Sequence, residues 1–231
     1  MNSSILPISS TSPVSERPQS LTDQIHERMR EEILNATWRP GDVVIEPELA
    51  VRYGVSKTPV REALRLLSQE GWIVTMPRKG YLVRPLRLHD VREVFELRLL
   101  LEPGLLAKAA REASLTSLDG LKELVDAEQQ VGHTDDSPNS VGREFHLAAV
   151  RLASNDRAVG VVGGLLNEVR RLHHLLPGEE AHGSAAEVVG DHLAIVEAMS
   201  RRDSDTVFEL TRDHIESSAT RLTNAFRLGG V

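Results

Sequence analysis

The chain has 231 residues, 40% of them hydrophobic and 26% charged, and a formal net charge of −7. This composition is typical of a soluble protein with room for one or two domains. The absence of cysteine excludes disulfides, thiolate metal sites and cysteine nucleophiles. No apolar run approaches the ~20 residues of a membrane span and no signal-peptide core is present, so we expect a cytoplasmic protein without a membrane partner.

The acidic total conceals a basic region near the N-terminus. Residues 17–87 hold 12 Lys and Arg against 9 Asp and Glu, whereas the remainder holds 15 against 25. Phosphate contacts come from a local patch and not from the net charge. The asymmetry is therefore typical of a small DNA-reading module joined to an acidic domain with another task.

The first elements are a tail, a helix, a strand and a second helix. Residues 1–18 are rich in Ser, Thr and Pro, which predicts a flexible tail. An apolar stripe at helical spacing then predicts a helix over 21–36. A short apolar run predicts a strand over 43–45, and residues 46–53 are typical of a second helix.

The next helix, over 54–71, has two chemically different faces. Its apolar face carries Val60, Ala63, Leu64 and Leu67. Its polar face carries Lys57, Thr58, Arg61, Arg65 and Ser68. Such a cationic face, with its N-terminal residues foremost, is what a helix-turn-helix presents to a DNA major groove. An ordinary amphipathic helix with a solvated basic face is the alternative.

A basic hairpin follows this helix. Two short strands over 72–75 and 81–83 flank a tip that contains Arg78, Lys79 and Gly80. The order helix, strand, helix, helix, hairpin predicts a winged helix-turn-helix domain over 19–86, whose tip can reach a minor groove. A plain surface hairpin is the alternative.

From residue 87 to 231 the pattern is helical throughout, so the predicted fold class is mainly α, with a winged helix-turn-helix domain followed by an all-helical bundle. The predicted helices cover 88–112, 117–131, 138–153, 157–176, 184–201 and 204–226. Residues 135–136 and 178–180 are predicted loops, and Pro103 predicts a break or kink in the first helix of this domain.

Three histidines, His146, His192 and His214, lie on apolar helix faces and are predicted to point inward. A single inward histidine is more often a hydrogen-bonded core residue than a ligand. Three on three helices favour convergence on a divalent metal such as Zn or Ni. Without cysteine, a carboxylate, water or bound acid would complete the coordination.

Residues 21–84 resemble the DNA-binding domain of the GntR family of bacterial transcription regulators. The motifs that carry the resemblance are PGD at 40–42, ELA at 48–50, GVSKTPVREAL at 54–64 and KGYLV at 79–83. The resemblance implies DNA contacts from Lys57, Thr58, Arg61 and Gly80, although the family usually has Arg where this chain has Lys57. Charge and geometry add Arg52, Ser56, Arg65, Arg78 and Lys79.

Residues 88–226 resemble the FCD ligand-binding domain of the FadR subfamily. The motifs are FELRLLLE at 95–102, EFH at 144–146, DHLAIVEAM at 191–199 and RDHI at 212–215. The resemblance implies that the three histidines bind metal and that Arg98 and Asn155 contact a small organic acid. Arg98 is equally well explained as a structural ion pair. Gly142 stands where the family has its fourth metal ligand, an Asp.

We therefore expect a metabolite-responsive repressor without enzymatic activity. It would bind a double-stranded DNA operator as a homodimer, under control of an organic acid and a divalent metal. The dimer follows from the resemblance and from two-fold operator symmetry. Two alternatives stay open, a metal-dependent enzyme that uses the three-histidine site and a pure metal sensor. The chain contains no HExxH signature and no obvious general base, which favours the repressor.

Overall fold

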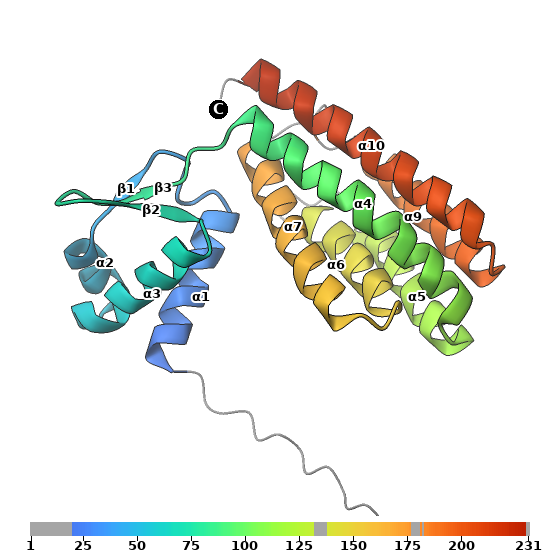
Figure 1. Ribbon diagram of the computed structural model, residues 1–231, viewed down its shortest axis with the longest axis horizontal. Helices are drawn as coiled ribbons and strands as arrows, with labels where there is room; N and C mark the ends of the chain where they lie inside the picture. The colour runs from blue at the N-terminus through green and yellow to red at the C-terminus, as the bar shows by residue number, and fades with distance from the viewer. Residues whose placement is uncertain (1–19, 132–137, 177–180, 182, 230–231) are drawn as a thin grey trace, which may run out of the picture.

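The computed structural model of the chain describes residues 20–131, 138–176, 181 and 183–229. Figure 1 shows two regions beside each other, an N-terminal one with a small sheet and a C-terminal bundle of long helices. The predicted tail over 1–18 and the predicted loops at 135–136 and 178–180 lie outside the described residues.

The N-terminal region is a winged helix-turn-helix. Its elements are α1 (Leu21–Leu34), β1 (Val43–Val44), α2 (Glu46–Tyr53), α3 (Lys57–Gln69), β2 (Ile73–Met76) and β3 (Gly80–Val83). The three antiparallel strands have the order β1-β3-β2, with Val44 opposite Tyr81. Because α1 and α3 bury their apolar stripes against each other, the polar face of α3 is turned outward.

Local sequence signals fix the ends of these helices. Ser20 and Asp23 form a capping box at the start of α1. The helix ends at Leu34, two residues before the predicted end, because Ala36 takes a left-handed conformation with φ 55°. Gly54 ends α2 with φ 67°, a conformation that glycine adopts without steric cost.

The C-terminal region is entirely helical within the described residues. Its helices are α4 (Leu88–Glu112), α5 (Leu115–Val131), α6 (Pro138–Arg151), α7 (Asp156–Leu175), α9 (Ala185–Ser200) and α10 (Ser204–Gly229). Of the break or kink predicted at Pro103, the break is wrong, since α4 is a continuous helix of 25 residues that contains this buried proline. A proline removes one backbone hydrogen bond, and here the packing of α4 against α10 and α7 holds the helix together.

Within the bundle, α4 packs against α6, α7, α9 and α10. Side chains from these helices form a core that includes Leu106, Phe145, Ile195 and Met199. Among the described helices, none combines the length and the apolar character that crossing a membrane requires. The mainly α fold class predicted from the sequence is confirmed.

Candidate nucleic-acid interface and candidate metal centre

The outward face of α3 carries the cationic residues that the sequence singles out. Lys57 and Thr58 are exposed in its first turn, and Arg61 and Arg65 are exposed in the next two turns. Ser56 takes the position before the helix, but its side chain makes no capping hydrogen bond. This differs from the capping role that its position suggests. The face is open to solvent because the buried side chains of α3 pack on its other side, in a core shared with α1, α2 and the sheet.

Arg61 is held by an acidic neighbour from another helix. Its Nε donates to both carboxylate oxygens of Glu46, at 3.1 and 3.0 Å, and its Nη2 donates to Oε2 at 2.9 Å. The hydroxyl of Tyr81 on β3 donates to Oε1 of Glu46 at 3.3 Å. The hydrogen bonds from Arg61 and the charge of its guanidinium outweigh partial burial and lower the pKa of Glu46. Sequence reasoning missed Glu46, because its partner is 15 residues away on a different helix.

Two other predicted DNA contacts are also paired with carboxylates. Arg52 on α2 lies 3.1 Å from Glu32 on α1, measured from Nη2 to Oε2. Arg65 lies 3.2 Å from Glu62, three residues earlier on α3. Both guanidiniums are about half exposed, with 47% and 58% of the side-chain area accessible. The Arg65–Glu62 pair is exposed on both sides and therefore weak, so it can give way to DNA phosphates, whereas Glu32 has only 14% of its side chain accessible.

The wing tip is basic, and its geometry depends on one glycine. Arg78 and Lys79 are exposed, and Arg78 takes a left-handed conformation with φ 64°. Gly80 has φ 102°, and a Cβ on it would lie 2.5 Å from the carbonyl oxygen of Val44. The close approach of β3 to β1 therefore requires glycine at this position. Gly80 has a structural role whether or not its backbone also meets DNA.

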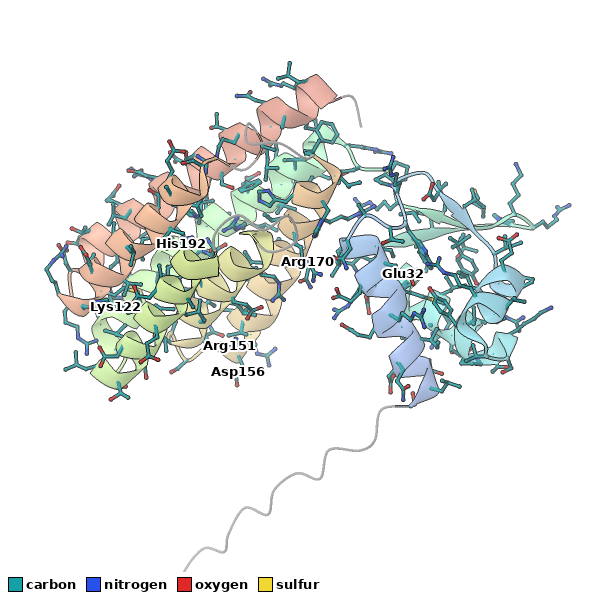
Figure 2. The ribbon with its side chains drawn as sticks, turned by 180° about the vertical axis from the view of Figure 1, so that it is seen from behind. Glu32, Lys122, Arg151, Asp156, Arg170 and His192 are labelled. Atoms are coloured by element: carbon teal, nitrogen blue, oxygen red, sulfur yellow. The ribbon has the colours of Figure 1, made fainter. Side chains whose placement is uncertain are left out.

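The two regions meet through consecutive arginines on α7. Arg170 donates to Glu31 Oε2 at 2.7 Å and to Asn35 Oδ1 at 2.6 Å, both on or next to α1. Figure 2 shows Arg170 projecting from α7 toward the winged domain. Arg171 donates to the backbone oxygen of Arg84 at 3.2 Å, and its guanidinium lies 5.9 Å from the centroid of the Trp72 ring. Burial lowers the pKa of Arg171 to about 10.

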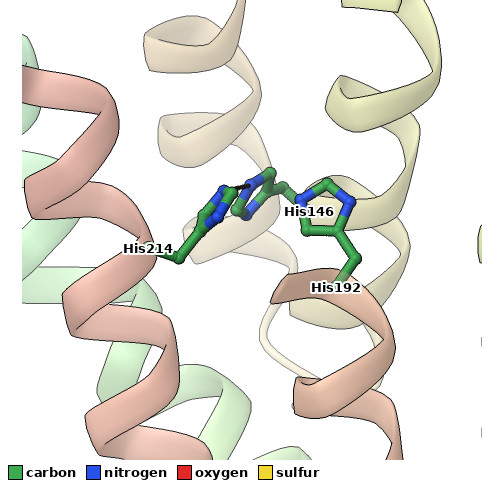
Figure 3. Close-up of side chains that lie close together, drawn as sticks. All are labelled: His146, His192 and His214. Carbon is green, nitrogen blue, oxygen red and sulfur yellow. Dashed lines mark hydrogen bonds between the residues drawn. The ribbon is translucent and has the colours of Figure 1, made fainter. Parts of the chain in front are cut away.

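The three predicted metal ligands converge inside the helical bundle. Figure 3 shows His146 from α6, His192 from α9 and His214 from α10 facing one another. One ligand nitrogen from each ring lies within 4.8 Å of the other two, and all three side chains are buried. The Nε2 atoms of His146 and His214 are 3.2 Å apart. Two nitrogens bound tetrahedrally to one zinc ion, at ~2.0–2.1 Å each, lie about 3.3 Å apart, so the spacing fits a metal.

Two carboxylates orient these rings from outside the cluster. Glu102 Oε2 on α4 lies 2.7 Å from Nδ1 of His146, and Asp191 Oδ2 on α9 lies 3.0 Å from Nδ1 of His214. A carboxylate beside Nδ1 favours the proton on that nitrogen and leaves the lone pair of Nε2 for a metal. Burial lowers the pKa of His146 to about 3 and also lowers that of His214, which favours the neutral form that a metal ligand must have.

Arg98 lies next to the cluster but is already paired. Its Nε is 2.5 Å from Oε1 of Glu102, and its Nη2 is 3.4 Å from Nε2 of His146. Burial opposes the ionisation of Glu102, but the charge of Arg98 and the hydrogen bonds from Arg98 and His146 outweigh it and lower the pKa of this carboxyl group. The alternative interpretation of Arg98 from the sequence was a structural ion pair, and this pair is present. The i, i+4 spacing of Arg98 and Glu102 is the signal that could have found Glu102.

The other predicted effector contact lies at the start of α7. Asn155 is exposed, and its Oδ1 accepts a hydrogen bond from the backbone N–H of Ala158 at 3.2 Å. The side chain thus caps the helix. A role for Asn155 as an effector contact stays a prediction.

Comparisons with protein families agree with this division of the chain. Residues 21–83 match the family described as bacterial regulatory proteins, gntR family, and residues 93–217 match the FCD domain. An uncharacterized HTH-type transcriptional regulator, YdhC from Bacillus subtilis, is 26% identical over 93% of this chain and 96% of its own. The HTH-type transcriptional repressor RspR from Escherichia coli is 26% identical over 86% of this chain and 87% of its own.

Solved structures show the same fold. A structure of McbR/YncC from Escherichia coli superposes with a TM-score of 0.75, over 90% of this chain and all of the other. The sequence identity is 22%, so this likeness speaks for the arrangement of helices and strands and not for a ligand.

Proposed function

Because the chain belongs to the GntR family of bacterial regulatory proteins and carries an FCD domain, we propose that this DNA-binding transcription regulator is a homodimeric repressor controlled by a small organic acid. The observation that carries the proposal is the exposed cationic face of α3 beside a basic wing tip. A helix of this kind reads base edges in the major groove, while a wing holds the backbone or the minor groove. The chromosomal target would place the protein in the bacterial cytoplasm.

Metal binding is supported by the donor set. The three imidazoles of His146, His192 and His214 would hold a divalent ion such as Zn or Ni, with Glu102 and Asp191 orienting two of the rings. A bound ion would supply positive charge for the carboxylate of an organic acid. Arg98 contributes less to such a site than the sequence suggests, because Glu102 already balances its charge.

The dimer has a candidate interface on α4 and α10. A shallow groove of about 330 Å³ lies there, lined mostly by apolar side chains, and Leu100 on its edge is 71% exposed. Exposed apolar surface on an ordered helix is typical of a protein interface. Arg92 and Glu96 also line the groove, one turn apart, so a two-fold copy would bring opposite charges together.

Effector binding would reach the DNA-binding domain through α7. This helix packs against α6, which carries His146, and its Arg170 and Arg171 contact α1 and the residue that follows β3. An acid or a metal that favours one arrangement of the bundle would thereby favour one orientation of the winged domains. The two winged domains of the dimer would then fit the two half-sites of an operator better or worse.

The DNA-binding part is tested by selecting duplexes from a random pool with the full chain. For the selected duplex, we expect Arg61→Ala to weaken binding by about 5- to 150-fold, the range of a bidentate base contact. Gel shifts at two salt concentrations would measure the loss, and thermal melting would check that the fold is unchanged. Ser68→Ala, on the same face but without charge, is the control. Unchanged affinity of Arg61→Ala would remove Arg61 from the interface.

The effector part is tested by thermal shift with small carboxylic acids and with neutral or cationic metabolites of similar size. We expect stabilisation by acids, and loss of this stabilisation in His214→Ala. His89→Ala removes an exposed histidine, with 74% of the side chain accessible, and should behave like the wild type. Stabilisation by neutral or cationic compounds alone would contradict an acid effector.

A further inference from the structure

Glu46 occupies an unusual place for an acidic residue on a DNA-binding surface. It is the first residue of α2, and its side chain lies between Arg61 of α3 and Tyr81 of β3. Only 20% of the Glu46 side chain is accessible, against 60% of the Arg61 side chain. A carboxylate near DNA repels phosphates, so its position calls for a physical reason.

The contact uses only one edge of the Arg61 guanidinium. Glu46 accepts from Nε and Nη2, which form the side edge of the group. A guanidinium has five N–H donors in a planar fork, and the end edge, formed by Nη1 and the second N–H of Nη2, points away from Nε. The bidentate contact to guanine needs two parallel N–H groups, and the end edge has them. Arg61 can therefore keep Glu46 and read a guanine at the same time.

Glu46 is itself held in place by the wing. The pairing of Val44 with Tyr81 sets β3 beside the segment that leads into Glu46, and the Tyr81 hydroxyl donates to the carboxylate. The closeness of β3 and β1 depends on Gly80. Three elements of the fold thus converge on one carboxylate, which fixes the plane of the Arg61 guanidinium before DNA arrives.

We propose that Glu46 is a positioning residue that determines specificity by orienting Arg61 for one guanine in each half-site. It lowers affinity for DNA in general, because it repels phosphates, and it raises discrimination at that guanine, because a pre-oriented side chain loses less conformational freedom on contact. The inference rests on the proposed role of α3 in reading DNA.

Glu62 provides a matched comparison. It is also a carboxylate paired with an arginine of α3, since it lies 3.2 Å from Arg65. The two side chains of this pair are similarly exposed, at 47% for Glu62 and 58% for Arg65, and the pair lies within one helix. Glu62→Gln therefore removes the same charge from the same domain and leaves the hydrogen bonds between Arg61 and Glu46 in place.

The experiment uses the full chain and a duplex that the wild type selects from a random pool. Each guanine of a half-site is replaced in turn by 7-deazaguanine, which lacks the N7 acceptor. For the wild type, we expect one guanine whose replacement weakens binding by about 5- to 150-fold. In Glu46→Gln, we expect the loss at that guanine to shrink at least three-fold, while affinity for an unselected duplex rises.

Glu62→Gln should raise affinity for the unselected duplex and leave discrimination at that guanine unchanged. Tyr81→Phe, which removes one hydrogen bond to Glu46 without changing the charge, should reduce discrimination in the same direction as Glu46→Gln but less. In an Arg61→Lys background, Glu46→Gln should have no further effect on discrimination, because lysine cannot form a fork. Equal discrimination in Glu46→Gln and Glu62→Gln would overturn the inference. Unchanged operator binding by Arg61→Ala would instead overturn the proposed interface.

Discussion

Arg61 and Arg98 are both paired with a glutamate, yet the two pairs lie in opposite surroundings. Arg61 and Glu46 are on the surface of the winged domain, with 60% and 20% of their side chains exposed. Arg98 and Glu102 lie inside the helical domain, with 3% and 0% exposed, and Glu102 also meets His146. The first pair leaves the end edge of the Arg61 guanidinium open to water or DNA, whereas the second is closed off from solvent.

The difference shows that ion pairs have different roles in the two domains. On the winged domain, ion pairs add little stability and leave each arginine able to bind DNA. In the bundle, each charged group is stable only while its neighbours remain, so Arg98, Glu102 and His146 form one unit. The DNA-binding surface should therefore tolerate single substitutions that the histidine cluster does not.

The largest effect is expected from breaking the buried pair. Glu102→Gln keeps the size of the side chain but leaves the charge of Arg98 uncompensated in the core. We expect it to destabilise the helical domain by ~3–5 kcal/mol, the usual cost of a buried charge without its partner. Chemical denaturation, followed by circular dichroism at 222 nm, would measure the free energy of unfolding.

Two controls test the contrast between the domains. Glu62→Gln on α3 should change the free energy of unfolding by less than ~1 kcal/mol, because that pair is exposed. The double substitution Arg98→Met with Glu102→Leu should recover most of the stability that Glu102→Gln loses, because no unpaired charge remains. A small effect of Glu102→Gln would mean that water reaches the cluster and solvates Arg98.

The second effect concerns backbone fit in the winged domain. Gly80 and Gly41 both have positive φ angles, 102° and 89°, but only at Gly80 would a Cβ meet other atoms. Both alanine variants carry the conformational cost, and Gly80→Ala adds the clash with Val44. We expect Gly80→Ala to cost ~1–3 kcal/mol more than Gly41→Ala. Hydrogen exchange of the β1 and β3 amides would measure the loss of stability. Equal losses in the two variants would mean that β1 moves aside freely.

The winged domain could be predicted almost completely from the sequence. Helix caps and turns there are local signals, as with Ser20 and Gly54, and the alternation of apolar and polar positions on α3 decides which face is outward. The inward direction of the three histidines was predicted for the same reason, because a helix face is set by spacing within one segment. Their convergence in the structure follows from that spacing and the packing of three helices.

The partners of these residues could not be predicted, because they come from other elements. Asp191 is 23 residues from His214, and Glu46 is 15 residues from Arg61. No periodicity within one helix links such pairs. The course of α4 through Pro103 was missed for a related reason, since the packing of neighbouring helices outweighs the local preference of proline to end a helix.

The third effect concerns the metal affinity of the buried histidine cluster when a negative charge is added to it. Gly142 lies one helical turn before His146 on α6, on the same face. Gly142→Asp would add an anionic ligand to three neutral imidazoles, so we expect metal affinity to rise at least ~10-fold. Competition with a chromogenic chelator would measure it. Gly164→Asp, at an exposed glycine of α7 with open space around it, is the control. Equal affinity in both variants would mean that the three histidines do not hold the ion.

The smallest effect is expected at the Arg170–Glu31 pair of the junction, whose side chains are neither fully exposed nor buried. The side chain of Arg170 is 21% exposed and that of its partner Glu31 is 39% exposed, so the pair contributes at most ~1 kcal/mol. Its importance lies in orientation, because Arg170 holds the winged domain against α7 through two hydrogen-bond acceptors, Glu31 and Asn35.

Arg170→Ala should therefore leave the unfolding of each domain nearly unchanged and widen the distribution of distances between them. Spin labels on exposed positions of α3 and α5, with distances measured by pulsed electron resonance, would show the widening. Arg157→Ala, at an exposed arginine near the start of the same helix, should leave the distribution as in the wild type. If both variants give the wild-type distribution, then Arg171 and its contacts with Trp72 and Arg84 hold the junction without help from Arg170. In that case effector binding in the bundle would act on the winged domain through the end of β3 and not through α1.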